Sequence, residues 1–78
     1  MQVTLKMPKV GDAADKVLVL EVMVKRGDRV GQGNLLMLIE TDKATVEVPS
    51  PLAGTVVKVM VAVGDEVVTG APTFAIEN

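Results

Sequence analysis

The chain contains two copies of one pattern, and this repeat constrains its fold more than any other feature. Residues 19–41 (VLEVMVKRGDRVGQGNLLMLIET) and 56–78 (VVKVMVAVGDEVVTGAPTFAIEN) align without a gap at a shift of 37, and ten of the 23 positions are identical. At a shift of 41, TLKMPK (4–9) lies over TVEVPS (45–50). Repeated supersecondary units stack on one another. We therefore predict one domain, residues 1–78, built from two equivalent halves, residues 3–41 and 44–78.

Each half has the composition of β-structure. Sixteen of the 78 residues are valine and only Phe74 is aromatic, and branched side chains favour a pleated, half-buried surface. In TVEVPS the two valines alternate with Glu47, which predicts a strand with one buried face. The Gly-Asp pairs at 27–28 and 64–65 predict turns, because glycine accepts a positive φ and aspartate bonds to nearby backbone.

These patterns predict an all-β fold. We expect a flattened barrel or sandwich of two four-stranded antiparallel sheets related by a pseudo-twofold axis. The valines of the repeated VMV segments are expected inside it: Val22, Val24, Val59 and Val61.

The composition excludes several classes of function. The chain has no cysteine and no histidine, which removes disulfides, thiolate nucleophiles, imidazole bases and the usual zinc ligands. A net charge of −2 and the lack of stacking aromatics argue against a nucleic-acid partner. The chain has no apolar run of about 18 residues, so no membrane-spanning helix is predicted. The N-terminus lacks the features of a signal peptide, so we expect a cytoplasmic protein, or a mitochondrial matrix protein if a transit peptide was removed.

The two halves differ in the connection after their first strand. The change of shift from 41 to 37 indicates four extra residues in KVGDAADK (9–16), where the second half has the shorter SPLAG (50–54). Loops accept insertions more readily than strands and often carry function. This connection is therefore a candidate recognition loop.

Lys43, one of six lysines, falls between two expected strands, LLMLIE (35–40) and TVEVP (45–49). The four residues TDKA between them are enough for a tight hairpin turn. The repeat places the equivalent position beyond the C-terminus, so Lys43 is expected at the end of the molecule opposite the two termini. One interpretation is an ordinary solvated lysine. The other is an acceptor for a group attached through an amide bond.

The segment ETDKATVEVPSPLAGTV, with KRGDRVGQG before it and VGDEVVTG after it, resembles the lipoyl domain of the dihydrolipoamide acyltransferase component of 2-oxo acid dehydrogenase complexes. The resemblance covers essentially the whole chain. It implies a non-catalytic carrier with lipoate attached to Lys43, and with Asp42 and Ala44 recognised around the lysine. The implied partners are a lipoate-attaching enzyme, a 2-oxo acid decarboxylase, the acyltransferase core and dihydrolipoamide dehydrogenase, and the isolated domain is expected to be a monomer.

Two related functions stay open at this point. Biotin carrier domains of carboxylases share the fold, but they usually place methionine on both sides of the lysine, where this chain has Asp42 and Ala44. An unmodified adaptor module of the same fold is the second alternative. The segment VPSPLAG is more similar to pyruvate complexes than to 2-oxoglutarate complexes. Residues expected to distinguish one partner complex from another lie around the lysine: Gly11, Asp12, Asp15, Glu40 and Glu47.

Overall fold

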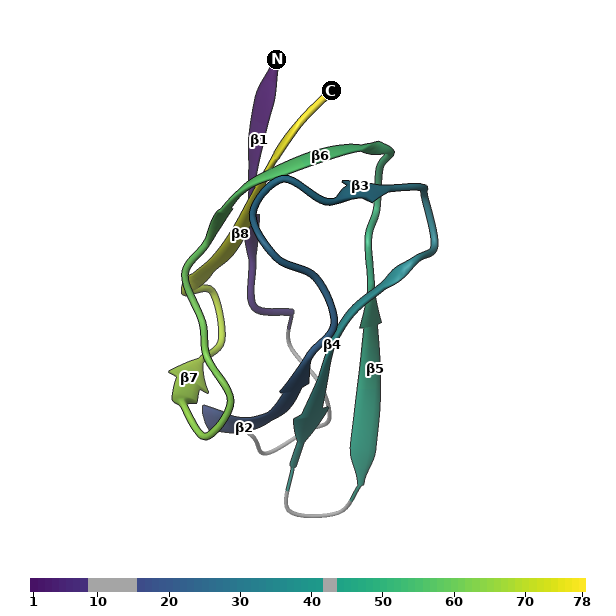
Figure 1. Ribbon diagram of the computed structural model, residues 1–78. Coiled ribbons are helices and arrows are strands. Elements are labelled where there is room, and N and C mark those ends of the chain that lie inside the picture. The colour runs from purple at the N-terminus through teal and green to yellow at the C-terminus, as the bar shows by residue number, and fades with distance from the viewer. Residues whose placement is uncertain (9–15, 42–43) are drawn as a thin grey trace.

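The computed structural model describes residues 1–8, 16–41 and 44–78, and all regular elements in these ranges are strands (Figure 1). They are β1 (Gln2–Lys6), β2 (Lys16–Val22), β3 (Arg29–Val30), β4 (Leu35–Glu40), β5 (Thr45–Pro49), β6 (Gly54–Val59), β7 (Glu66–Val68) and β8 (Pro72–Glu77). The prediction of an all-β fold is confirmed.

The strands form two four-stranded sheets with the same internal order. One sheet has the order β1-β8-β6-β3 and the other β5-β4-β2-β7, and every neighbouring pair is antiparallel. Exchanging β1 with β5, β2 with β6, β3 with β7 and β4 with β8 converts one order into the other. Each sheet therefore takes two strands from each half of the chain, and the two halves are interleaved.

The strand register corrects the expected alignment of the first strands. Gln2 lies opposite Glu77, and Thr45 lies opposite Glu40. Glu40 and Glu77 are equivalent at a shift of 37, so Thr45 is equivalent to Gln2 at a shift of 43, and the expected shift of 41 is wrong. The side chains of a strand alternate between its faces, so an error of two residues leaves each side chain on the face expected for it.

The same register changes the length of the insertion. Nine residues, 7–15, separate β1 from β2, and four residues, 50–53, separate β5 from β6. Since β6 begins one residue later than the equivalent of β2 at a shift of 37, the first connection is longer by six residues rather than by the expected four. Most of this connection, residues 9–15, lies outside the described residues.

The core lies between the sheets and is mostly aliphatic. Phe74 is its largest fully buried side chain, and the rest of the cluster is Met7, Val17, Val19, Val30, Leu36, Met37, Ile39, Val56, Val61 and Ile76. Of the four valines expected inside, only Val61 is buried, while Val22, Val24 and Val59 are partly buried and pack against the cluster. The expectation therefore holds fully for Val61 alone, and the other three valines contact the core while part of their surface stays exposed.

The two Gly-Asp turns have the predicted geometry. Gly27 has a φ of 96° and Gly64 a φ of 92°, a left-handed conformation that side chains disfavour. Each aspartate carboxylate accepts a hydrogen bond from the backbone three residues earlier: Lys25 N–H donates to Asp28 Oδ2 at 3.0 Å, and Ala62 N–H donates to Asp65 Oδ2 at 2.8 Å. These turns close each half at equivalent places.

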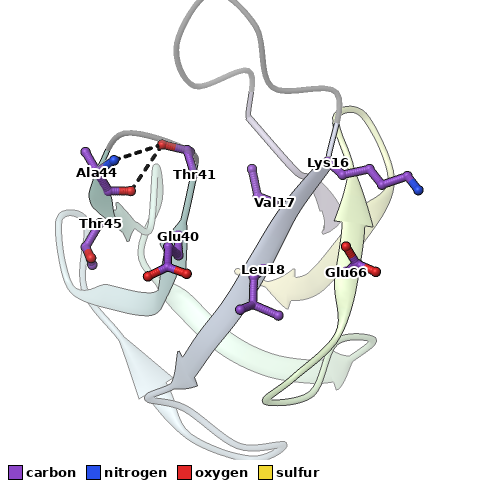
Figure 2. A pocket seen from close by; sticks show the side chains of 8 residues that line it. All are labelled: Lys16, Val17, Leu18, Glu40, Thr41, Ala44, Thr45 and Glu66. Atoms are coloured by element: carbon purple, nitrogen blue, oxygen red, sulfur yellow. Dashed lines mark hydrogen bonds between the residues drawn. The ribbon is translucent and has the colours of Figure 1, made fainter.

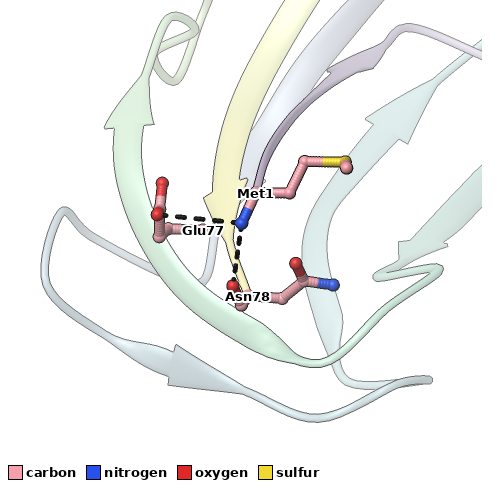
Figure 3. A network of polar contacts seen from close by, with 3 residues as sticks. All are labelled: Met1, Glu77 and Asn78. Atoms are coloured by element: carbon pink, nitrogen blue, oxygen red, sulfur yellow. Dashed lines mark hydrogen bonds and ion pairs between the residues drawn. The ribbon is translucent and has the colours of Figure 1, made fainter.

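The molecule is elongated, with extents of 33 × 19 × 18 Å. Both termini lie at one end, and the facing ends of β4 and β5 lie at the other (Figure 1). At the end with the termini, the Met1 ammonium donates to the Asn78 carbonyl at 3.1 Å and lies 3.9 Å from the Glu77 carboxylate (Figure 3). The Asn78 N–H donates in return to the Met1 carbonyl at 3.1 Å. We call this end the terminal pole and the opposite end the hairpin pole.

Candidate attachment site

The hairpin pole is formed by β4, β5 and the short segment between them. The strands run from Leu35 to Glu40 and from Thr45 to Pro49, as predicted, and their last paired residues are Glu40 and Thr45. Asp42 and Lys43 lie outside the described residues. The described part of the predicted site is therefore its frame, Thr41 and Ala44, which flank these two residues in the sequence.

Three hydrogen bonds join Thr41 to Ala44, and Figure 2 shows those of the threonine hydroxyl. The Thr41 N–H donates to the Ala44 carbonyl at 2.8 Å. The Thr41 hydroxyl lies 3.1 Å from the same carbonyl, to which it can donate, and it accepts from the Ala44 N–H at 3.2 Å. The base of the turn is thus closed by one main-chain bond and by the threonine side chain. Ala44 is exposed to solvent.

A polar hollow of about 620 Å³ lies beside this frame (Figure 2). It is lined by Lys16, Val17, Leu18, Glu40, Thr41, Ala44, Thr45 and Glu66. Lys16 is the first described residue after the long connection, so the connection returns to the sheet at the hairpin pole. The residues predicted within it, Gly11, Asp12 and Asp15, lie outside the described residues.

Val17 and Gly54 are one pair of equivalent positions at which the two poles differ. Val17 lines the hollow at the hairpin pole, and its equivalent at a shift of 37 is Gly54. A Cβ atom at Gly54 would lie 2.5 Å from the Glu77 carbonyl oxygen and 2.7 Å from Ile76 Cγ2. Glycine therefore allows β6 and β8 to approach closely at the terminal pole, and no other residue fits there without a shift of the backbone.

Four exposed glutamates surround two leucines on the sheet that carries the hairpin. Leu18 lies opposite Glu40 on one side and Glu66 on the other, and Leu38 lies likewise between Glu21 and Glu47. Glu40 and Glu47 were predicted as recognition residues. Glu21 and Glu66 were not named from the sequence as members of this acidic group. The signal for them was their position on the polar face of strands whose side chains alternate between two faces.

No metal centre or membrane span was found in the part of the chain that the structure describes. In residues 1–8, 16–41 and 44–78, no group of three or more potential metal ligands lies close enough together to hold a cation. No helix in these ranges is long and apolar enough to cross a membrane.

Comparisons with known proteins agree with this geometry. The family profile described as "Biotin-requiring enzyme", of the biotin/lipoyl type, matches residues 3–76. The dihydrolipoyllysine-residue acetyltransferase component of the pyruvate dehydrogenase complex from Pseudomonas aeruginosa is 50% identical over 85% of the chain, and that from Haemophilus influenzae is 42% identical over 99%. The chain spans only 12% and 13% of the length of these two relatives.

The solved structures include both branches of the family. The lipoyl domain of the 2-oxoglutarate dehydrogenase complex from Azotobacter vinelandii superposes with a TM-score of 0.79 at 25% identity, over 97% of this chain and 96% of that one. A single-chain, multi-domain long-chain acyl-CoA carboxylase superposes with a TM-score of 0.77 at 27% identity, over 95% of this chain and 7% of that one. The fold alone does not separate the two branches, whereas the higher identities to the acetyltransferase components favour the lipoyl branch. The chain belongs to the biotin/lipoyl carrier family, and within it to the lipoyl domains.

Proposed function

We propose that Lys43 is the attachment site for lipoate. The single observation that carries this proposal is the position of the Asp-Lys pair in the sequence between Thr41 and Ala44. These two residues are bonded to each other across the base of a hairpin at the exposed pole. The family supplies the second support, because its members carry their cofactor covalently on a lysine. A lysine between two paired strands would be an accessible acceptor for an attaching enzyme.

The chemistry of the residues fits this group. Attachment needs a primary amine in an exposed position, and the attached dithiol exchanges with fewer groups where other thiols are absent. The chain offers the Lys43 amine, an exposed Ala44 and no cysteine. The deprotonated amine attacks the lipoyl carboxyl carbon, which the attaching enzyme has activated. The amide C–N bond forms, the bond to the activating group breaks, that group leaves with its electron pair, and the amine releases its proton.

We propose that the domain acts as a mobile carrier in a 2-oxo acid dehydrogenase complex, of the pyruvate type that its relatives' names give. When bound, the lipoyl group supplies a disulfide that accepts acyl groups and electrons. The domain itself presents the arm. The proposed partners are a 2-oxo acid decarboxylase, the acyltransferase core and dihydrolipoamide dehydrogenase. Tethering to the complex would raise the effective concentration of the arm at each of their sites. The bacterial relatives support a cytoplasmic location.

We propose that partner recognition uses the hairpin pole. The sequence places Gly11, Asp12 and Asp15 in the long connection, which returns to the sheet at Lys16 beside the frame. Glu40 and Glu47 are exposed on the adjoining strands. A cationic surface around a partner's active-site entrance would be attracted to these carboxylates, and such attraction acts mainly on the association rate.

The attachment proposal is tested by measuring intact mass after incubation with a lipoate-attaching enzyme, lipoate and ATP. The wild-type chain is expected to gain one lipoyl group. Lys43→Arg is expected to keep its fold and gain none, because a guanidinium does not form the amide under enzymatic conditions. Lys16→Arg is the matched control, since Lys16 lines the same hollow, and it is expected to be lipoylated like the wild type.

A parallel incubation with a biotin-attaching enzyme, biotin and ATP separates the alternatives. A biotinyl increment from a biotin-attaching enzyme, with no lipoyl increment, would assign the chain to the carboxylase branch. No increment from either enzyme would favour the unmodified adaptor. A lipoyl increment on Lys43→Arg would show that another lysine is the acceptor.

A further inference from the structure

The hairpin frame differs from its equivalent at the terminal pole in how it is closed. Thr41 is equivalent to Asn78, and Ala44 is equivalent to Met1. Main-chain groups alone join Asn78 and Met1 in the two bonds described above, and the Met1 amine donates to the Asn78 carbonyl. At the hairpin pole the corresponding donor, the Ala44 N–H, bonds to the Thr41 hydroxyl. At the hairpin pole, a side-chain hydroxyl therefore takes the place that a main-chain carbonyl has at the terminal pole.

The residues between the two positions explain the need for such a bond. Two-residue hairpin loops favour turns in which one or both central residues have a positive φ, and they are rich in Asn-Gly, Asp-Gly and Gly-Gly pairs. The central pair here is Asp42 and Lys43, which contains no glycine. Lysine disfavours a positive φ. The intrinsic turn preference of the pair is therefore weak, and closure depends more on the flanking residues.

We propose that Thr41 is a positioning residue for the Asp42–Lys43 pair, and that its hydroxyl holds the two flanking backbone positions at the spacing that the attaching enzyme recognises. This inference rests on the proposed function of Lys43. The hydroxyl both accepts from the Ala44 N–H and can donate to the Ala44 carbonyl, so it bonds both polar main-chain groups of the residue that follows the lysine.

A positioning role has a specific kinetic signature. The binding-competent form of the hairpin becomes a smaller fraction of the ensemble when the clamp is removed, and the apparent affinity falls by that fraction. Once the hairpin is bound, the enzyme surface holds the lysine, so the chemical step is unchanged. Loss of the hydroxyl should therefore raise the KM of the attaching enzyme for the domain and leave kcat unchanged.

The experiment compares three variants as substrates of a purified lipoate-attaching enzyme, with lipoate, ATP and the unmodified domain. Thr41→Val removes the hydroxyl and keeps the branched shape, and it is expected to raise KM about fivefold with kcat within about twofold, in line with the loss of exposed hydrogen bonds. Thr41→Ser keeps the hydroxyl and is expected to return KM to the wild-type value. Thr45→Val, in the next strand, is the matched control and is expected to behave as the wild type.

Amide exchange tests the clamp without depending on any variant or on lipoylation. In the wild-type domain, the Ala44 N–H is expected to exchange at least about tenfold more slowly than a fully exposed amide, because it is hydrogen-bonded. Exchange at the exposed rate would overturn the proposal, even if Thr41→Val did not fold. A KM for Thr41→Val equal to that of the wild type would also overturn it, as would a defect that serine does not rescue.

The two proposals fail in different ways. If the wild-type chain gains no lipoyl group, or Lys43→Arg gains one, the proposed function is wrong, while slow Ala44 exchange would still report the closed frame. If the wild-type chain is lipoylated on Lys43 and Thr41→Val is an equally good substrate, only the role of Thr41 is wrong.

Discussion

Single residues decide how each pole of this molecule is built. The repeat aligns Thr41 with Asn78 and Val17 with Gly54, and at both pairs the two halves use different chemistry. The threonine hydroxyl closes the hairpin frame. Gly54 lets β6 lie against the backbone of Glu77. The closure by Thr41 had a signal in the sequence, a threonine just before a two-residue loop, because threonine hydroxyls bond to nearby backbone. Nothing in the local sequence signals the second, since the close approach involves a strand that is distant in sequence.

Gly54→Ala is expected to destabilise the fold. The added methyl group would overlap the Glu77 carbonyl oxygen and Ile76 Cγ2, and overpacking of this kind costs about 1 to 3 kcal/mol. Gly31→Ala is the control, because a Cβ there meets only the flexible Asn34 side chain, at 3.4 Å. Urea unfolding should place the midpoint of Gly54→Ala well below those of Gly31→Ala and the wild type. Equal midpoints would mean that β6 and β8 separate there at little cost.

At the scale of strands, the sequence predicted which segments are strands better than it predicted how the strands of the two halves align. The bounds of β4 and β5 were predicted correctly because the TDKA turn separates two clear strands. The first strand was aligned two residues out of register, because Pro8 falls over Pro49 at a shift of 41 and the alternation of a strand cannot distinguish shifts that differ by two. Register depends on pairing with β8, which no local pattern encodes. Ala44, Glu40 and Glu47, which were named from the sequence, are exposed on the hairpin, and their roles in recognition stay predictions. The hydrogen bonds of the frame could not be predicted without the structure.

Shortening the first connection is expected to separate two kinds of recognition. Deletion of residues 9–14 leaves three residues, 7, 8 and 15, between β1 and Lys16, and the equivalent stretch of the second half, residues 50–52, has the same length. The fold should therefore persist with a similar unfolding midpoint. Lipoylation should remain nearly normal, because the hairpin is untouched. Acylation by the partner decarboxylase should fall about tenfold or more if this loop supplies specific contacts, as truncated interface contacts commonly do. The length-matched replacement of residues 9–14 by Gly-Ser repeats tests whether sequence or length is responsible, and normal acylation in both variants would reduce the loop to a connector.

At the scale of the whole molecule, charge is distributed unequally between two sheets of equal topology. The strands of the β5-β4-β2-β7 sheet carry four glutamates and one lysine: Lys16, Glu21, Glu40, Glu47 and Glu66. The strands of the other sheet carry three cations and one glutamate: Lys6, Arg29, Lys58 and Glu77. The net charge of −2 is therefore unevenly distributed, with the strands of one sheet acidic and those of the other basic. A partner with a basic surface would approach the acidic face first.

Glu40 and Glu77 provide a matched test of this asymmetry, because they occupy equivalent positions at opposite poles. Glu40→Gln is expected to lower the association rate with a basic decarboxylase surface about twofold to threefold at low salt, with the difference disappearing as ionic strength screens the charge. Glu77→Gln is expected to leave the rate unchanged. Stopped-flow or surface-binding kinetics at several salt concentrations measure both. The same loss in the two variants would indicate that only net charge matters.

The main-chain hydrogen bonds between Met1 and Asn78 hold the two ends of the chain close enough to be joined by a short peptide linker. These residues are equivalent to Ala44 and Thr41, which are bridged by two residues. A bridge of two residues from Asn78 to Met1 would therefore cyclise the chain at the geometry of its own hairpin, and a cut elsewhere in the ring would give a circular permutant with new ends. If that bridge were Asp-Lys, with threonine at position 78, the molecule would present an acceptor lysine at each pole. If this ring gained two lipoyl groups, the attaching enzyme would recognise the turn itself, without needing the rest of the hairpin pole.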